Sequence, residues 1–409
     1  MSARSFFDEI FAGDSGCPPG RCPPTLSLMA SAKSTSTRLL FSESEHGTDM
    51  FHATGFRAPD PFLFLESRGK TSILLSDLEI DRGRKEARVD EVVSWSDLER
   101  TVAANTGTKP SPAAVIAAFI KGRVKARGGS RPQVPSDFPL GLARELERHG
   151  VTVTPVEGMF RPERQIKSAG EIRLLTEATR ITETGMERAF EVLRASSIGR
   201  GNVLRWGGAV LTSERLRIEI ESAILRAGGI PAGNSIVACG DQACDPHERG
   251  HGPLKGNSLI ILDLFPRARS GYYGDLTRTV VRGKASEAQS RLWEICLLGQ
   301  KLALGSLRAG ADGGAIHREV TEFFRDNGYP TERVGGRWTG FFHGTGHGLG
   351  LDLHEAPRFG AGKLKAGQVF TIEPGLYIPG IGGVRHEDVA LITKTGHKLL
   401  SRCPKPLEL

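Results

Sequence analysis

The pattern of apolar and polar residues changes along the chain, and the change divides it into two parts. Between residues 38 and 160, the apolar runs at 61–66 and 71–76 are short and are separated by polar SRGK, which predicts a strand hairpin. Residues 112–126 and 137–149 have the apolar spacing of amphipathic helices. This first part is therefore predicted to be a small α/β domain.

Long amphipathic helices and apolar strand-like runs follow one another from residue 161 onward. Ser168, with Glu171 three positions later, has the signature of a capping box. It opens a helix whose apolar stripe runs from Ile172 to Leu193. Further helices are predicted from Thr212 or Ser213 to Gly228, over 286–305, and over 312–327 with Asp312 as its cap. The runs SLIILDLF, TRTVV, QVFTIEPGLYI and VALIT predict strands, so this part is expected to be α+β.

A polar connection with one proline, RPERQIK, separates the two predicted domains. We therefore expect a domain over 38–160 and a second over 161–409. Residues 1–37 are rich in serine, proline and glycine and lack a sustained apolar period, which predicts a flexible tail. Because Met29 is followed by ASAKSTST, we hypothesise that translation of the natural protein begins there.

Composition is typical of a globular protein, and we expect a cytoplasmic one. Its 409 residues are enough for two domains, and 39% hydrophobic with 25% charged residues is close to the soluble average. The net charge of +7 is spread along the chain without a basic stripe, so a nucleic-acid partner is not expected. No apolar run is long enough to span a membrane, and the start lacks a signal core. Six cysteines are too few for a disulfide scaffold, and neither Cys17/Cys22 nor Cys239/Cys244 has a second pair at zinc-finger spacing, so free thiols in a reducing compartment are predicted.

Five residues stand out as candidate metal ligands. Four of them are acids in or beside apolar runs, and the fifth is a histidine in a glycine-rich stretch: Asp263, Asp275, Glu373, Glu387 and His347. Each acid alone has an ordinary explanation as a turn residue, a cap, a strand end or an exposed strand residue. Together they are harder to explain, because ionised carboxylates are costly to bury without a compensating charge.

Such a set suits two divalent ions of the first transition row. Oxygen ligands favour Mn²⁺, and the imidazole tolerates Co²⁺, Zn²⁺ or Fe²⁺. Two such ions can share a water molecule and lower its pKa, which produces a hydroxide nucleophile near neutral pH. The set therefore predicts hydrolytic chemistry.

Further candidates surround the five predicted ligands. His343 and His354 share the stretch FHGTGHGLGLDLHE with His347, and His247 lies in CDPHERGHG. Imidazoles can stabilise an oxyanion or pass a proton near neutral pH. Arg385 is two positions before Glu387, and in a strand both side chains share one face. Arg385 is therefore placed to meet a substrate carboxylate or to brace a ligand, unless it is a surface residue.

These segments occur in the order found in the methionine-aminopeptidase/Xaa-Pro peptidase family, which the chain resembles over about residues 165–409. The resemblance rests on the motifs around His247, GDLTRT, HGTGHGLGLDLHE, TIEPGLY and VRHED. It implies a "pita-bread" catalytic domain. Residues 38–160 resemble the N-terminal domain of the aminopeptidase P, prolidase and creatinase members.

The resemblance also implies a role for each candidate residue. Asp263 would bind one metal ion, Asp275 and Glu387 would bridge both, and His347 and Glu373 would complete the ligand set. Glu373 would also carry the proton of the bridging hydroxide. His354 and His247 would stabilise the tetrahedral intermediate, and His343 and Arg385 would contact substrate. One departure is that Asp263 and Asp275 are twelve positions apart, whereas the family pattern usually has eleven. We expect the turn between them to absorb the extra residue.

The function expected from these observations is hydrolysis of Xaa-Pro peptide bonds by a dinuclear metal peptidase, either an aminopeptidase or a dipeptidase. The large N-terminal domain argues against a methionine aminopeptidase, and the family implies a homodimer or homotetramer. Alternatives are a creatinase-like metal-free hydrolase, a metal-dependent amidohydrolase acting on a small non-peptide amide, and a non-catalytic binding module. The intact five-ligand set speaks against the first and the last.

Overall fold

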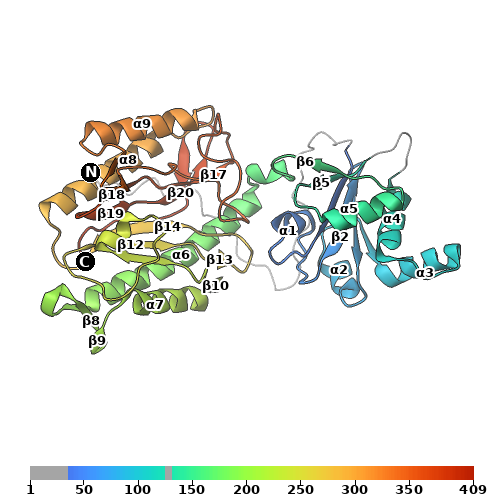
Figure 1. The fold of residues 1–409 in the computed structure, drawn as a ribbon, viewed down its shortest axis with the longest axis horizontal. Coiled ribbons are helices and arrows are strands. Elements are labelled where there is room, and N and C mark those ends of the chain that lie inside the picture. The colour runs from blue at the N-terminus through green and yellow to red at the C-terminus, as the bar shows by residue number, and fades with distance from the viewer. Residues whose placement is uncertain (1–35, 125–130) are drawn as a thin grey trace, which may run out of the picture.

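The computed structural model describes residues 36–124 and 131–409, which fold into two lobes joined by one connection (Figure 1). The expectations for Met29 and for nearly all of the tail 1–37 lie outside the described residues. So do the last two positions of the helix predicted over 112–126, which as observed ends at Arg123.

A mixed six-stranded sheet of order β4-β3-β2-β1-β5-β6 forms the centre of the N-terminal lobe. β2 and β3 are antiparallel, with Leu63 opposite Leu74, which confirms the predicted hairpin. The elements of this lobe are β1 (Arg38–Ser42), α1 (Thr48–Thr54), β2 (Phe62–Ser67), β3 (Lys70–Leu75), α2 (Ile80–Glu86), β4 (Glu91–Ser94), α3 (Trp95–Thr106), α4 (Pro112–Arg123), β5 (Gln133–Pro135), α5 (Leu140–Arg148) and β6 (Thr154–Val156).

Both faces of this sheet are buried. Successive side chains of a strand point to opposite faces. Leu63 and Leu65 of β2 therefore enter a core with Phe119 of α4, whereas Phe62 and Phe64 enter a second core with residues of α1 and α2. Helices cover each face, which fits the predicted small α/β domain.

The connection between the lobes leads directly into the longest helix. A short 3-10 helix (Pro162–Gln165) precedes α6 (Ala169–Ala195). The predicted capping box is confirmed, because the Ser168 hydroxyl accepts a hydrogen bond from the Glu171 backbone and the Glu171 carboxylate accepts one from the Ser168 backbone. Figure 1 shows α6 running from the connection across the C-terminal lobe.

Strands form the middle layer of the C-terminal lobe, with α6 and α7 on one side and α8 and α9 on the other (Figure 1). Its sheets have the orders β11-β12-β14, β17-β20-β21, β18-β19, β7-β8-β9, β10-β13 and β15-β16. The bounds are β7 (Ser197–Ile198), β8 (Leu204–Trp206), β9 (Ala209–Val210), α7 (Ser213–Arg226), β10 (Gly229–Ile230), β11 (Ile236–Cys239), β12 (Leu259–Leu264), β13 (Arg267–Ala268), β14 (Leu276–Val281), α8 (Glu287–Ser306), α9 (Gly313–Asp326), β15 (Glu332–Val334), β16 (Arg337–Thr339), β17 (Val369–Ile372), β18 (Gly375–Ile378), β19 (Gly382–Arg385), β20 (Asp388–Ile392) and β21 (His397–Leu399). The predicted helices are confirmed, with Thr212 and Asp312 as N-caps of α7 and α9.

Candidate metal centre and its cavity

Two of the predicted ligands are positioned by the antiparallel pair β12 and β14. The alternation along β12 sends Ile260 and Leu262 into the core beneath α6 and α7, so Asp263 lies on the opposite face. Asp263 is directly across from Thr277 of β14. Asp275 comes two residues before Thr277 and therefore shares that face. Both carboxylates thus point away from the α6–α7 core.

Two more acids come from the other strand layer. Phe370 and Ile372 of β17 enter the core with α8 and α9, which leaves Glu373 on the opposite face. The Thr371 hydroxyl, on the same face as Glu373, lies 3.2 Å from Glu373 Oε1. Glu387 lies in the connection between β19 and β20, and its Oε2 accepts a hydrogen bond of 2.7 Å from the Thr277 hydroxyl.

His347 is held against β17 by its backbone. Its N–H donates to the Thr371 hydroxyl at 3.0 Å, and its carbonyl accepts from the Thr371 N–H at 2.9 Å. This close approach requires glycine at the preceding position, because a Cβ on Gly346 would lie 1.9 Å from the Thr371 carbonyl oxygen. The glycine-rich stretch therefore serves to bring His347 onto the strand.

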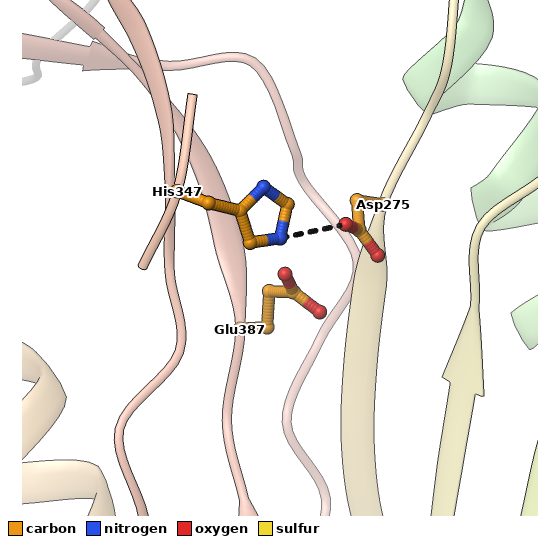
Figure 2. Close-up of side chains that lie close together, drawn as sticks. All are labelled: Asp275, His347 and Glu387. Carbon is orange, nitrogen blue, oxygen red and sulfur yellow. Dashed lines mark ion pairs between the residues drawn. The ribbon is translucent and has the colours of Figure 1, made fainter. Parts of the chain in front are cut away.

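Three of the five residues form a tight cluster, which Figure 2 shows in close-up. One potential ligand atom from each of Asp275, His347 and Glu387 lies within 4.8 Å of the other two. His347 Nε2 is 3.4 Å from Asp275 Oδ2 and also 3.4 Å from Glu373 Oε1. Asp263 lines the same cavity, but its Oδ2 is 2.5 Å from Arg385 Nη2.

Burial and the charges of neighbouring carboxylates disfavour the charged forms of Asp275, Glu373 and Glu387. Burial, followed by the charges of neighbouring carboxylates, raises the pKa of Glu387 well above its usual value. Burial also raises the pKa of Glu373, and it raises that of Asp275 to about 7. Burial alone would lower the pKa of His347, but its hydrogen bond to Asp275 and the charge of Glu373 outweigh burial and raise it to about 9.

The residues present fit divalent metal ions. Glu387 Oε1 is buried and has no hydrogen-bond partner within the described part of the chain. A buried carboxylate oxygen without a partner is unfavourable, and a cation beside it removes the cost. Carboxylates with one imidazole are the donor set preferred by first-row ions such as Mn²⁺.

A cavity of about 1150 Å³ opens over this cluster. All five predicted ligands line it, together with the other four predicted site residues, His247, His343, His354 and Arg385. The His354 ring meets the His347 ring edge to face, with centroids 4.2 Å apart. Burial and the charge of His347 lower the pKa of His354. His247 is exposed on the loop that follows β11.

Arg385 is fixed by other protein groups. Besides Asp263, its guanidinium donates to the Thr277 hydroxyl at 3.2 Å and to the Tyr377 hydroxyl at 3.0 Å. Of the roles considered for Arg385, these contacts favour bracing a ligand over meeting a substrate carboxylate. Its neighbour His386 points elsewhere and packs edge-on against Trp293 at 4.8 Å between ring centroids.

Tyr377 connects Arg385 to His343. His343 Nδ1 is 2.9 Å from the Gly344 carbonyl, which only accepts, so the proton is on Nδ1 and Nε2 is an acceptor. The Tyr377 hydroxyl, 2.8 Å from Nε2, therefore donates to His343 while accepting from Arg385. Burial and the charge of Arg385 lower the pKa of His343 to about 3, so its ring is neutral.

Sequence reasoning did not single out several residues of this site. Tyr377 and Thr277 touch the predicted residues, and Arg358 and Phe342 line the cavity. The nearest signal was the position of Tyr377 in TIEPGLY and of Thr277 in GDLTRT. The expectation for the longer turn is consistent with the structure: β13 lies between Asp263 and Asp275, and both acids still reach the cavity.

The fold and the site define a metal-dependent hydrolase, and comparisons with known proteins give its family. An Xaa-Pro dipeptidase of Pyrococcus horikoshii is 31% identical over 281 residues, 67% of this chain and 74% of that relative. An Xaa-Pro aminopeptidase of Haemophilus influenzae is 32% identical over 276 residues, 58% of each chain. The crystal structure of the prolidase from Pyrococcus horikoshii matches with a TM-score of 0.72 and 25% identity, covering 91% of this chain and 95% of that one.

A sequence profile of metallopeptidase family M24 matches residues 173–394, more than half of the chain. The chain belongs to metallopeptidase family M24. The expected α+β pita-bread domain, preceded by an α/β domain, is confirmed, and the protein is an enzyme that uses divalent metal. Among the described residues, no helix has the length and apolar character to cross a bilayer.

Proposed function

We propose that this protein hydrolyses Xaa-Pro peptide bonds with a pair of divalent metal ions held by Asp263, Asp275, His347, Glu373 and Glu387. The observation that carries the proposal is the buried, partnerless Oε1 of Glu387 inside a cluster of acids that open onto a large cavity. The names of the relatives from Pyrococcus horikoshii and Haemophilus influenzae support the substrate class.

The residues around the cluster have distinct proposed roles. Two divalent ions, when bound, would offset the carboxylate charges and would lower the pKa of a bound water molecule. Glu373 takes the proton that the attacking water loses and passes it to the leaving nitrogen, because its carboxylate lines the cavity and lies 3.4 Å from His347 Nε2. His354 and His247 donate hydrogen bonds to the carbonyl oxygen as negative charge develops on it.

A neutral aromatic wall suits the proline ring. Phe342 and neutral His343 line the cavity, and the buried Tyr377 ring packs behind them, 5.2 Å from the Phe342 ring. Proline lacks a backbone N–H, so shape and apolar contact must replace the hydrogen bond that other residues offer. We propose that this wall selects proline after the cleaved bond.

We further propose that the enzyme favours dipeptides. Arg358 lines the cavity and has no ion-pair partner within residues 36–124 and 131–409, whereas Arg385 is held by Asp263. A free guanidinium is suited to bind the C-terminal carboxylate of an Xaa-Pro dipeptide.

Three finer expectations remain proposals. Mn²⁺ is the metal that the oxygen-rich donor set favours, and Co²⁺, Zn²⁺ or Fe²⁺ are acceptable to it. A homodimer or homotetramer follows from family resemblance alone. A cytoplasmic location is supported by the four free cysteines among the described residues.

The test compares hydrolysis of Xaa-Pro, Xaa-Pro-Xaa and Xaa-Pro-amide by Mn²⁺-loaded protein. We expect the unmodified protein to hydrolyse Xaa-Pro and Glu373→Gln to lose this turnover. In Arg358→Met, the KM for Xaa-Pro should rise about tenfold, whereas the KM for Xaa-Pro-amide should not change. Glu219→Gln, at the surface between α6 and α7, is the matched control. Cleavage of the tripeptide alone would identify an aminopeptidase instead. No cleavage of any of the three would favour the amidohydrolase alternative.

A further inference from the structure

A buried group of charges lies between the two lobes, next to the loop that carries His354. Arg164 and Lys167 belong to the connection between the lobes, and their side chains are only 5% and 2% exposed. Both form ion pairs with Glu355, whose side chain is 3% exposed. Glu355 directly follows His354 in the chain. None of these three residues is a predicted metal ligand.

Arg164 joins three parts of the molecule. Its Nη1 donates to Asp49 Oδ1 at 2.7 Å and to the Thr48 hydroxyl at 3.0 Å, both at the start of α1 in the N-terminal lobe. Its Nη2 donates to Glu355 Oε2 at 2.6 Å and to Asp352 Oδ2 at 2.7 Å in the C-terminal lobe. One guanidinium thus holds α1 and the His354 loop together.

Glu355 in turn fixes the backbone on both sides of His354. Its Oε2 accepts a hydrogen bond from the Asp352 N–H at 3.3 Å, and its own N–H donates to the Gly348 carbonyl at 2.9 Å. The packing is close, because a Cβ on Gly350 would lie 2.3 Å from Glu355 Oε1. The loop from His347 to Arg358 is therefore anchored at Glu355, whereas the His354 side chain is exposed in the cavity.

Simple stabilisation does not account for such a cluster. Buried ion pairs are costly to desolvate, and apolar residues of similar volume are often at least as stabilising. The charged groups add a defined geometry, because a hydrogen bond between charged groups forms only over a narrow range of donor and acceptor positions. A ring that must lie within hydrogen-bonding distance of a reacting carbonyl oxygen benefits from that geometry.

We propose that Glu355, Arg164 and Lys167 are positioning residues that fix the His354 loop and make its placement depend on docking of the N-terminal lobe. The N-terminal lobe would then contribute to turnover through α1, although none of its described residues lines the cavity. The effect on turnover rests on the proposed function, whereas the effect on the loop does not.

The kinetic test uses Glu355→Gln, which keeps the side-chain size and removes the charge. At a temperature well below unfolding, we expect kcat to fall about tenfold to a hundredfold, with KM changed less than about threefold and metal content unchanged. In a His354→Ala background, Glu355→Gln should have little further effect, because it acts through His354. The control is Arg188→Met, which breaks an ion pair between Arg188 of α6 and Glu219 of α7, away from the connection. Unchanged kcat, or additive losses in the double variant, would overturn the proposal.

A second measurement is independent of activity. Hydrogen–deuterium exchange of the segment 350–358 should be faster in Glu355→Gln and in Asp49→Ala than in the unmodified protein, and unchanged in Arg188→Met. Unaltered exchange in Glu355→Gln would refute the anchoring role. Unaltered exchange in Asp49→Ala would refute the dependence on the N-terminal lobe. Failure of the unmodified enzyme to cleave any proline peptide would refute the proposed function but leave this measurement valid.

Discussion

Single polar groups at the cavity wall and just behind it gain their hydrogen-bonding roles from the residues that they contact. The Gly344 carbonyl fixes the tautomer of His343, so the Tyr377 hydroxyl donates to His343 while it accepts from Arg385. Arg385 in turn holds Asp263 at 2.5 Å. A chain of hydrogen bonds therefore runs from the aromatic wall to a proposed metal ligand. Each member constrains the next, so loss of one should affect both the wall and the ligand.

Tyr377→Phe tests this chain of hydrogen bonds, because it removes only the hydroxyl group. Losing a hydrogen bond to a charged group costs about 1.5–3 kcal/mol, so we expect kcat/KM for an Xaa-Pro substrate to fall about tenfold or more. Tyr329→Phe, at a partly buried residue that packs against the core with α8 and α9, is the matched control. Steady-state kinetics decide the matter, and a Tyr377→Phe value within twofold of the unmodified enzyme would contradict the role.

At the scale of elements, the strands do most of the positioning. The period of two along β12 and β17 buries apolar residues against helices and leaves Asp263 and Glu373 on the faces toward the cavity. His347 is different, because it lies outside the regular strands and depends on backbone hydrogen bonds to Thr371. The position of that loop requires Gly346 to approach β17 closely.

Gly346→Ala should therefore displace His347. The added Cβ would meet the Thr371 carbonyl at 1.9 Å, so the loop must move away from β17. We expect metal content, measured by mass spectrometry after dialysis, to fall together with activity. Gly305→Ala in α8 is the control, because a Cβ there has no neighbour within 4 Å. Full metal content in Gly346→Ala would show that the contact is not needed.

At the scale of the whole molecule, the candidate metal centre contains acidic side chains from both strand layers. Because these side chains are buried close together, the stability of the metal-free fold should depend on pH. Burial, then neighbouring carboxylates, raise the pKa of Glu387 above its usual 4.5, so the folded chain binds this proton more tightly than the unfolded chain does. Its contribution to stability is thus present below about 4.5 and is lost as pH rises. His347 acts in the same direction, because its pKa rises from 6.5 to about 9.

We therefore predict that the melting temperature of chelator-treated protein falls as the pH rises from about 5 to about 8. Added Mn²⁺ should restore it at the upper end of this range, because ligands that bind only the folded state stabilise it. Glu387→Gln should flatten the pH dependence, whereas Glu219→Gln should not. Scanning fluorimetry across the pH series measures the melting temperatures of the metal-free, Mn²⁺-loaded and variant proteins. A metal-free melting temperature that is constant or rises with pH would contradict the prediction.

The sequence alone determined the elements and the chemistry that they carry. Local periods and caps predicted the helices from Ser168, Thr212 and Asp312, because capping and amphipathic spacing are properties of neighbouring residues. The five candidate ligands and the three further histidines were also identified, since acids in apolar runs are conspicuous. All of them line one cavity.

Only the tertiary structure decided how these groups are held and connected. Arg385 was expected to meet substrate or to brace a ligand, and its contact with Asp263, 122 positions away, favours the second role. The same holds for Arg164 and Glu355, which are 191 positions apart. No local pattern encodes such pairs, because their contact depends on how the lobes and strand layers pack together rather than on the spacing of neighbours along the chain.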